Sequence, residues 1–483
     1  MKRRTGFALL AVGCALFSGA VVGKIGLSDG APAHEIVCLR TAPCEVYPCE
    51  TWAWATSPEV FGWSSAKLAV ARDYAESIGS AAVMIVDDGV VIEGWGDLAC
   101  NYSCHSMRKS LLSALYGIYI DEGAIDVTQT LEQLEIDELT PLTPIERQAT
   151  VGDLLSARSG VYVRAAGEAQ SMIERRPERG SHAPGTFWYY NNWDFNALGT
   201  IFDQETSEPS IYEAFRRRIA EPLEMQDFWA GSLRYDYAPY SVHPYYGFRM
   251  STRDLARFGL LFLREGRWKG SRIIPSSWIQ ESTTTHSQIG PESGYGYMWW
   301  TGEGSGLFPN VTIAGRGYYA SGYRGHLVVV LPYLDLVVVH RVDTFKSEGE
   351  VPNERFGVLL WMILDAAGET GIGEAPFIDL APGVRLAGNE LETRISGSRF
   401  EAVGGALRTE VVNDPDGALS ILLDGEVVYT GCWWIDADRY CVDVPEADDI
   451  GGCFDVVMED NLLRLYEIDG TLSIVLSMLE PVP

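Results

Sequence analysis

Residues 326–342, HLVVVLPYLDLVVVHRV, contain two uninterrupted runs of valine and leucine on either side of the turn residues 332–335. Runs that lack alternating polar residues are typical of strands buried on both faces. The Pro and Asp between the runs predict that the two strands lie side by side. The pair therefore requires a sheet that is covered on both faces, and this requirement constrains the fold more than any other feature of the chain.

Other segments supply the rest of such a fold. Asp87-Asp88-Gly89 lies between two runs rich in β-branched residues and predicts a hairpin. A helix is expected to open at Ser106, and helical spacing predicts four more, of which the second should end at Gly160: residues 63–79, 150–161, 251–266 and 355–368. Strands thus lie at both ends of a large unit with helices between them, which predicts an α/β fold with an antiparallel sheet.

The length of 483 residues predicts two or three domains. Residues 371–395 are rich in Gly and Pro and are expected to be a linker. Turn signals such as Asp424-Gly425 recur after it and predict a small all-β domain at 396–483. Before the linker we expect a main domain at 61–370 and an irregular, cysteine-containing lead segment at 24–60.

The N-terminus has the pattern of an export signal. Lys2, Arg3 and Arg4 precede an uncharged, mostly apolar stretch that ends near Gly23, with small residues at 18–20. We therefore expect a signal peptide at residues 1–23 and a periplasmic or secreted protein. An uncleaved N-terminal anchor is the alternative, because the stretch is near the lower length limit for spanning a bilayer.

The cysteines agree with an oxidising compartment, since eight of them follow Cys14. We expect a local disulfide between Cys441 and Cys453, with Cys432 paired to a cysteine earlier in the chain. A metal or redox site at Cys100 and Cys104 is the rival interpretation. It lacks a full tetrahedral ligand set, because only a neighbouring histidine could join the two thiols.

Ser106 and Lys109 are the strongest catalytic candidates. Residues three apart on a helix share a face, so the amine can reach the hydroxyl. A lysine that is kept from water can lose its proton and then act as a base toward serine. Ser64 and Lys67 have the same spacing, but Lys67 belongs to an amphipathic helix that can expose it. The stretch after Lys109 is too apolar to lie on the surface.

A second stretch, YYNNWDFNALG, supports a catalytic interpretation. Tyr190 and Asn192 form a Tyr-x-Asn pattern, and Tyr189 with Asn191 forms a second one in the shifted frame. A phenol beside a lysine can pass protons to a leaving group, and an asparagine amide can hold a substrate carbonyl. Buried aromatic residues that precede a helix are the structural alternative.

The order of these features resembles the serine β-lactamase and DD-peptidase superfamily over about residues 60 to 370. The hairpin and the Ser-x-x-Lys helix are followed by TVGDLLSARSGV, the Tyr-x-Asn and ALG, EPLEM, STRDLARFG, YGYMWW and a late glycine-rich turn into paired strands. The likeness is greatest to the class C-like branch with 6-aminohexanoate-dimer hydrolase and related esterases, whose spacing favours Tyr190 and Asn192. It implies an antiparallel sheet flanked by helices, with an all-helical subdomain. It also implies an acyl-enzyme mechanism in which Ser106 attacks, Lys109 is the base and Tyr190 relays the proton.

One motif departs from the family pattern. The usual Lys-Thr-Gly or His-Thr-Gly is replaced by GYYASGYRGH at 317–326, which disfavours β-lactams and D-Ala-D-Ala peptides as substrates. The backbone N–H of Tyr323 is expected to complete an oxyanion hole with that of Ser106, and Ala320 is the alternative alignment. Arg316 or Arg324 could replace the missing charge, although a structural role is expected for each.

Together these features predict an exported serine hydrolase that cleaves a small-molecule or peptide-like amide or ester without a metal or organic cofactor. The net charge of −29 excludes nucleic acid as a partner, because such binding requires basic side chains that neutralise phosphates. Membrane contact is expected only through the N-terminal anchor. A non-catalytic periplasmic sensor and a binding function of the C-terminal β domain remain as alternatives, and the oligomeric state stays open.

Overall fold

The computed structural model describes residues 46–345 and 349–373 and, beyond them, 384–385, 395–396, 398–402, 409–415, 417–423, 425–436, 439–445, 451–459, 462–466 and 472–479. The expected signal peptide or anchor, residues 24–45 of the lead segment and most of the linker lie outside these residues. Within the described part of the chain, none of the helices has the length and apolar character needed to cross a bilayer.

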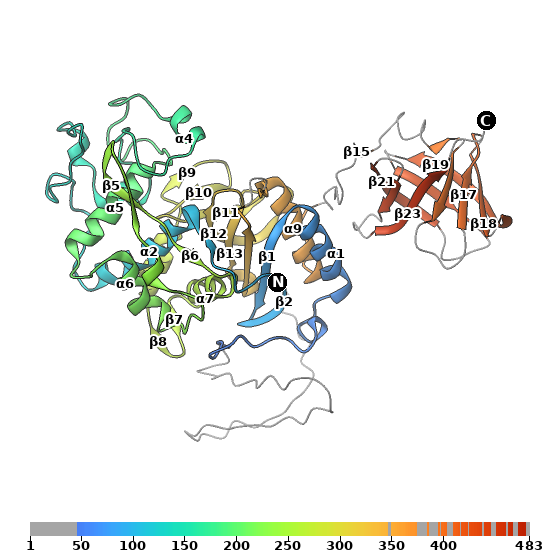
Figure 1. Cartoon of the computed structure of the whole chain (residues 1–483), viewed down its shortest axis with the longest axis horizontal. Helices are drawn as coiled ribbons and strands as arrows, with labels where there is room; N and C mark the ends of the chain where they lie inside the picture. Colours follow the sequence, from blue (N-terminus) through green and yellow to red (C-terminus); the bar gives the residue numbers. More distant parts are fainter. Residues whose placement is uncertain are drawn as a thin grey trace, which may run out of the picture.

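An antiparallel sheet of eight strands forms the centre of the main unit, in the order β2-β1-β14-β13-β12-β11-β10-β9 (Figure 1). The hairpin predicted at Asp87-Asp88-Gly89 joins the first two strands in the sequence. The bounds are β1 Ser80–Asp87, β2 Val90–Gly96, β9 Ser287–Gln288, β10 Ser293–Tyr295, β11 Trp300–Gly304, β12 Ile313–Gly322, β13 His326–Leu331 and β14 Leu336–Val342. Strands from both ends of the unit therefore form one sheet, as the sequence predicts.

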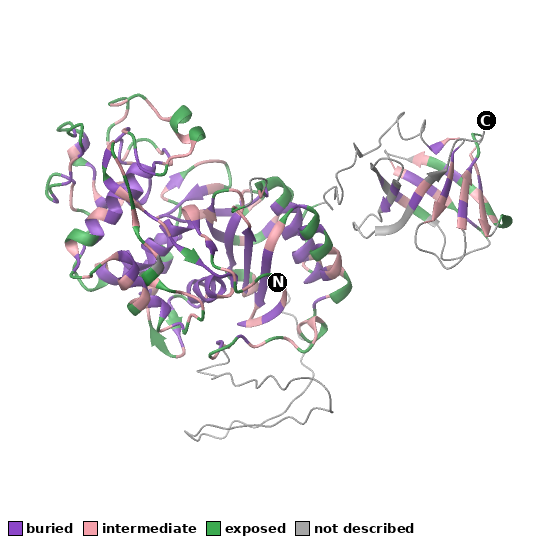
Figure 2. Cartoon of the chain, in the orientation of Figure 1, coloured by how far each residue is buried: buried purple, intermediate pink, exposed green. Residues whose placement is uncertain are grey.

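The two valine-rich strands, β13 and β14, are buried along their whole length, which confirms the prediction for them (Figure 2). Their side chains alternate between two separate apolar clusters. Val328 and Val337 belong to the cluster on the α2 and α7 side, whereas Val329 and Val338 belong to the cluster that contains α1 and α9. Since both faces are covered, neither strand has polar residues at alternate positions.

The helices lie on the two faces of this sheet and in a helical region between β2 and β9 (Figure 1). All five predicted helices form, but the one expected to end at Gly160 ends at Leu155, because Ala157 adopts a left-handed backbone conformation with φ of 58°. The bounds are α1 Ser65–Ser77, α2 Arg108–Asp121, α3 Val151–Leu155, α4 Gln170–Arg175, α5 Asn192–Glu205, α6 Ile211–Phe215, α7 Thr252–Leu263, α8 Ser276–Ser282 and α9 Asn353–Ala366.

Three pairs of short strands accompany the helical region: β3 Tyr102–Ser103 with β6 Arg249–Met250, β4 Tyr235–Ala238 with β5 Ser241–Tyr246, and β7 Arg267–Trp268 with β8 Ser271–Arg272. The pair β3–β6 matters for the site, because it holds the chain just before Ser106. The arrangement confirms the predicted fold class of mixed helices and antiparallel sheet.

The C-terminal part is all β, as predicted. Strands β16 to β23 pair in a closed ring, because β21 is bonded to both β20 and β22, and β15 pairs with the end of β21 that β20 does not reach. Apolar side chains such as Phe400 and Leu463 form its core. The bounds are β15 Val384–Arg385, β16 Arg399–Ala402, β17 Thr409–Asn413, β18 Ala418–Leu423, β19 Glu426–Asp436, β20 Arg439–Asp443, β21 Gly451–Glu459, β22 Leu462–Tyr466 and β23 Leu472–Leu479.

The disulfide predicted between Cys441 and Cys453 is present and joins β20 to β21 at directly opposed positions. The expectation that Cys432 pairs with an earlier cysteine is wrong, since it is an exposed free thiol on β19. Cys100 and Cys104 are also free thiols, and Cys104 is buried. Cys38 and Cys44 lie outside the described residues.

Candidate active site

Ser106 lies one turn ahead of helix α2, not inside it. The chain leaves β3, passes His105 with a left-handed φ of 46°, and forms a short 3-10 helix over His105–Met107. The backbone N–H of Met107 donates to the carbonyl of Cys104 over 3.0 Å. The expected helix start at Ser106 is therefore wrong by two residues, because this tight turn precedes the first α-helical residue.

The structure brings the side chains of Ser106, Lys109 and Tyr190 together. The amine Nζ of Lys109 lies 2.9 Å from Oγ of Ser106 and 2.6 Å from the phenol oxygen of Tyr190, a residue 81 positions away in the chain. Both distances are within the range required for proton transfer between positioned groups. A hydroxyl, an amine and a phenol thus form one continuous hydrogen-bonded chain.

The Lys109 amine is held in surroundings that favour its neutral form. The residue is 1 % exposed, and the structure shows no carboxylate paired with it among the described residues. Burial holds the pKa of Lys109 well below its usual 10.5, and the neighbouring cation of Arg108 lowers it further. A neutral lysine can accept a proton from a serine hydroxyl, whereas an ammonium cannot.

Arg108 is an unusual neighbour because its guanidinium is fully buried. Its central carbon lies 4.2 and 4.0 Å from the ring centres of Tyr245 and Tyr246, and it donates one hydrogen bond, to Asn196. It forms no ion pair within the described residues. Stacking on two aromatic faces stabilises a weakly hydrated guanidinium at this buried position beside Lys109.

Tyr190 is supported by an aromatic cluster. Its ring centre lies 5.2 Å from that of Phe195 and 5.4 Å from that of Trp300, and the Lys109 amine sits 4.1 Å above the ring. Burial raises the pKa of Tyr190 to about 12, although the hydrogen bond with Ser106 and the charge of Arg108 oppose the rise. The phenol therefore keeps its proton at neutral pH and can donate it.

The other Ser-x-x-Lys pair has no such surroundings. Oγ of Ser64 accepts a hydrogen bond from the backbone N–H of Lys67 and caps the start of α1. The Lys67 amine is partly exposed and forms an ion pair with Asp365 at 2.8 Å. The same spacing thus serves as a helix cap in one place and as a buried amine–hydroxyl pair in the other.

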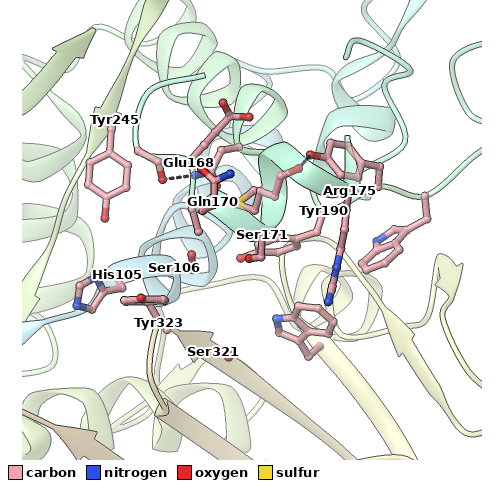
Figure 3. A pocket seen from close by; sticks show the side chains of 18 residues that line it. His105, Ser106, Glu168, Gln170, Ser171, Arg175, Tyr190, Tyr245, Ser321 and Tyr323 are labelled. Atoms are coloured by element: carbon pink, nitrogen blue, oxygen red, sulfur yellow. Dashed lines mark hydrogen bonds between the residues drawn. The ribbon is translucent and has the colours of Figure 1, made fainter. Parts of the chain in front are cut away.

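A cavity of about 630 Å³ opens onto Ser106 (Figure 3). Glu168, Gln170 and other residues of the segment 167–175, which we call the rim, form one wall, and Ser321 and Tyr323 from the end of β12 form the opposite wall. The remaining lining is largely aromatic and comes from Trp188, Tyr189, Tyr190, Tyr245 and Trp300. The cavity can therefore hold a substrate with an apolar portion beside the serine.

Comparison with known proteins identifies the family of this chain. The beta-lactamase family model matches residues 67–359, which is more than half of the chain. This chain belongs to the beta-lactamase family. The matched span contains Ser106, Lys109, Tyr190 and the whole eight-stranded sheet, so the resemblance deduced from the order of motifs is confirmed.

Two solved structures are similar to this member of the beta-lactamase family. "Putative 6-aminohexanoate-dimer hydrolase from Bacillus anthracis" shares 18 % identity with a TM-score of 0.49, covering 66 % of this chain and 87 % of that one. The octameric penicillin-binding protein homologue from Pyrococcus abyssi shares 16 % identity with a TM-score of 0.47, covering 85 % and 98 %. No curated protein sequence gave a significant match.

The two asparagines of the Tyr-x-Asn region differ in their surroundings. Asn191 caps α5, where its side chain accepts from the N–H of Trp193 and donates to Asp194. Asn192 lines the cavity, but its amide NH₂ already donates to the carbonyl of Gly167 over 2.7 Å. The NH₂ group carries a second N–H, so the expectation that Asn192 holds a substrate carbonyl stays a prediction.

Tyr323 directly follows β12 and lines the cavity, and the residue is 54 % exposed. Ala320 is buried and is not part of the lining. Neither Arg316 nor Arg324 lines this cavity: Arg316 borders a different depression, and the Arg324 guanidinium lies 5.3 Å from the ring centre of Tyr323. The position of the missing family lysine or histidine is thus not taken over by either arginine.

His326, at the start of β13, is buried behind the turn that carries Ser106. Its Nδ1 accepts a hydrogen bond from the Arg341 guanidinium at 3.0 Å, and its ring lies 5.3 Å from that of His105. Burial lowers the pKa of both histidines, that of His105 to about 4. Both therefore remain neutral at physiological pH and support the turn instead of supplying charge.

Several residues of the site were missed from the sequence. Arg108 could have been noticed, since a second cation directly before Lys109 in an apolar helix requires an explanation. Trp300 lines the cavity, whereas its neighbour Trp299 is fully buried, and the sequence YGYMWW does not distinguish the two. The rim has no motif that could have indicated its position.

Proposed function

We propose that this chain is an exported serine hydrolase that cleaves an amide or ester through an acyl-enzyme on Ser106. The observation that carries the proposal is the buried Lys109 amine, placed between the Ser106 hydroxyl and the Tyr190 phenol. Nothing other than proton transfer accounts well for a desolvated amine in this position, because an unpaired buried lysine reduces stability.

The first half of the reaction uses these three groups in turn. Oγ of Ser106 attacks the substrate carbonyl carbon while its proton passes to Nζ of Lys109. The negative charge on the carbonyl oxygen is stabilised by the backbone N–H groups of Ser106 and Tyr323. The proton then passes from Lys109 through the phenol of Tyr190 to the leaving group, and the bond between carbonyl carbon and leaving group breaks. Water hydrolyses the ester on Ser106 by the reverse proton path.

A fluorophosphonate probe tests this proposal on the full mature protein. The probe should label one serine, which peptide mass spectrometry should identify as Ser106. Ser106→Ala should abolish labelling, and Lys109→Met should slow it by about 10²-fold or more, since a positioned base contributes that much. Labelling that survives in Ser106→Ala would refute the assignment.

Ser64→Ala is the matched control, because it changes the serine of the other Ser-x-x-Lys pair, which takes no part in the proposed reaction. It removes a helix cap worth about 1 kcal/mol but should leave the labelling rate unchanged. Export is tested separately by sequencing the N-terminus of the protein recovered outside the cytoplasm. A mature N-terminus near residue 24 supports a cleaved signal, and an intact Met1 supports the anchor.

A further inference from the structure

Arg175 is the last residue of α4 and belongs to the rim that lines the cavity. Among the described residues, the structure shows no carboxylate in an ion pair with its guanidinium and no hydrogen bond from it. Figure 3 shows the Arg175 side chain extended from α4 into the cavity. All N–H donors of this guanidinium are therefore available to a ligand.

The other ionisable groups of the lining do not offset this charge. Glu168, whose side chain is 3 % exposed, is neutralised by an ion pair with the neighbouring Arg176. His105 is neutral at physiological pH because burial lowers its pKa to about 4. The cavity lining thus carries one net positive charge, although the whole chain carries a net charge of −29. A local excess of positive charge in an acidic protein favours an anionic ligand.

Arg175 and the turn at 317–326 lie on different sides of the serine. In Figure 3, the side chains of His105 and Tyr323 lie on one side of Ser106, and that of Arg175 lies on the other. An anion at Arg175 is therefore held away from the position where the family motif places its lysine or histidine. The aromatic lining can cover the methylene groups of a substrate that reaches from Ser106 to Arg175.

We propose that Arg175 binds a carboxylate at the far end of the acyl group, so that the enzyme prefers acyl chains that end in an anion. A guanidinium can hold a carboxylate through two parallel hydrogen bonds. We assign the anion to the acyl group because a cation that held the leaving group would slow its departure. The inference rests on the proposed function, because it requires the acyl group on Ser106 to occupy this cavity.

Pairs of p-nitrophenyl esters test the inference on the full mature protein. The mono-p-nitrophenyl esters of adipic and suberic acid carry the terminal carboxylate at two chain lengths, and in their matched partners a neutral carboxamide replaces it. After correction for spontaneous hydrolysis, kcat/KM at low salt should favour the carboxylate by about fivefold or more at one of the lengths or both, and added salt should reduce this ratio. A ratio of one or less at both lengths would overturn the inference.

Variants show whether the preference comes from Arg175. In Arg175→Gln the ratio of the two kcat/KM values should fall to within about twofold of unity, and in Arg175→Glu it should fall further. Arg316→Gln is the matched control, because it removes one cation that borders a different depression, and it should keep the full ratio. A ratio that persists in Arg175→Gln would overturn the inference. Its loss in Arg316→Gln would do so as well, because the net charge of the chain would then explain the preference.

Failure of the inference is distinguishable from failure of the proposed function. If the fluorophosphonate probe labels Ser106 but the carboxylate and carboxamide esters react equally, only the role of Arg175 is lost. If the probe does not label Ser106, both proposals fall together.

Discussion

Replacing Tyr190 by Phe removes a single hydroxyl and leaves the ring in its aromatic cluster. The contacts with Phe195 and Trp300 are made by the ring and should persist, and the Lys109 amine keeps its place 4.1 Å from the ring centre as a cation–π neighbour. What disappears is the 2.6 Å hydrogen bond between the phenol and the amine. Any change in the reaction therefore reports on the hydroxyl.

The expected effect on stability is small and that on the rate is large. A typical hydrogen bond contributes a net of about 0.5–1.5 kcal/mol to the free energy of unfolding, so the melting temperature should fall by only a few degrees. A positioned proton donor contributes about 10²–10⁴-fold to the rate when the leaving group needs the proton. The structure meets the distance requirement for such a donor, and burial keeps the Tyr190 phenol protonated.

The assay compares two substrates that share an acyl group, a p-nitrophenyl ester and an alkyl amide. The nitrophenolate ion leaves without a proton, whereas an amide nitrogen must be protonated before its bond to carbon breaks. In Tyr190→Phe, kcat/KM for the amide should therefore fall by about 10²–10⁴-fold, and that for the ester much less.

Equal losses for the two substrates would refute the role of Tyr190 in leaving-group protonation. They would indicate that the hydroxyl serves only to position Lys109, because that role affects the attack on both substrates alike. No loss for either substrate would remove Tyr190 from the mechanism. Thermal unfolding of the variant shows whether a loss reflects misfolding.

Three further predictions concern the surroundings of the site. Lys109 acts as a base in its neutral form, so the acylation rate should rise with pH and reach half of its maximum below pH 10.5. Arg108→Met should move this half-maximal point to higher pH, because it removes the cation that disfavours protonation of Lys109. A pH profile that is unchanged or moves to lower pH contradicts this. Asn191→Ala should lower the free energy of unfolding, measured by denaturant titration, by about 1–2 kcal/mol through loss of the α5 cap, and an unchanged value contradicts this. Gly117→Ala should lower the free energy of unfolding by about 1–3 kcal/mol despite the higher helix propensity of Ala, because the added Cβ would lie 2.2 Å from Trp278. A rise in melting temperature would show instead that the indole moves aside.

Much of the main unit was predictable from the sequence because its signals are local. The uninterrupted Val and Leu runs indicated β13 and β14, and the Asp87-Asp88-Gly89 turn indicated the first hairpin. The three-residue spacing of Ser106 and Lys109 indicated that the amine and hydroxyl could meet. The same locality explains the errors at Gly160 and Ser106, where a left-handed residue ended or delayed a helix that the apolar pattern would have continued.

The rest of the site depended on contacts between distant segments, which no local pattern encodes. Packing of α5 against α2 brings Tyr190 to Lys109, and the same packing determines that Asn191 caps a helix while Asn192 faces the cavity. The orientation of the Asn192 amide was decided by one carbonyl of the rim. Periodicity and spacing in the sequence thus determined which helices and strands form and which neighbours on a helix can meet. The burial of each polar side chain and the choice of its hydrogen-bond partner were decided only by the tertiary structure, because these depend on contacts between distant segments.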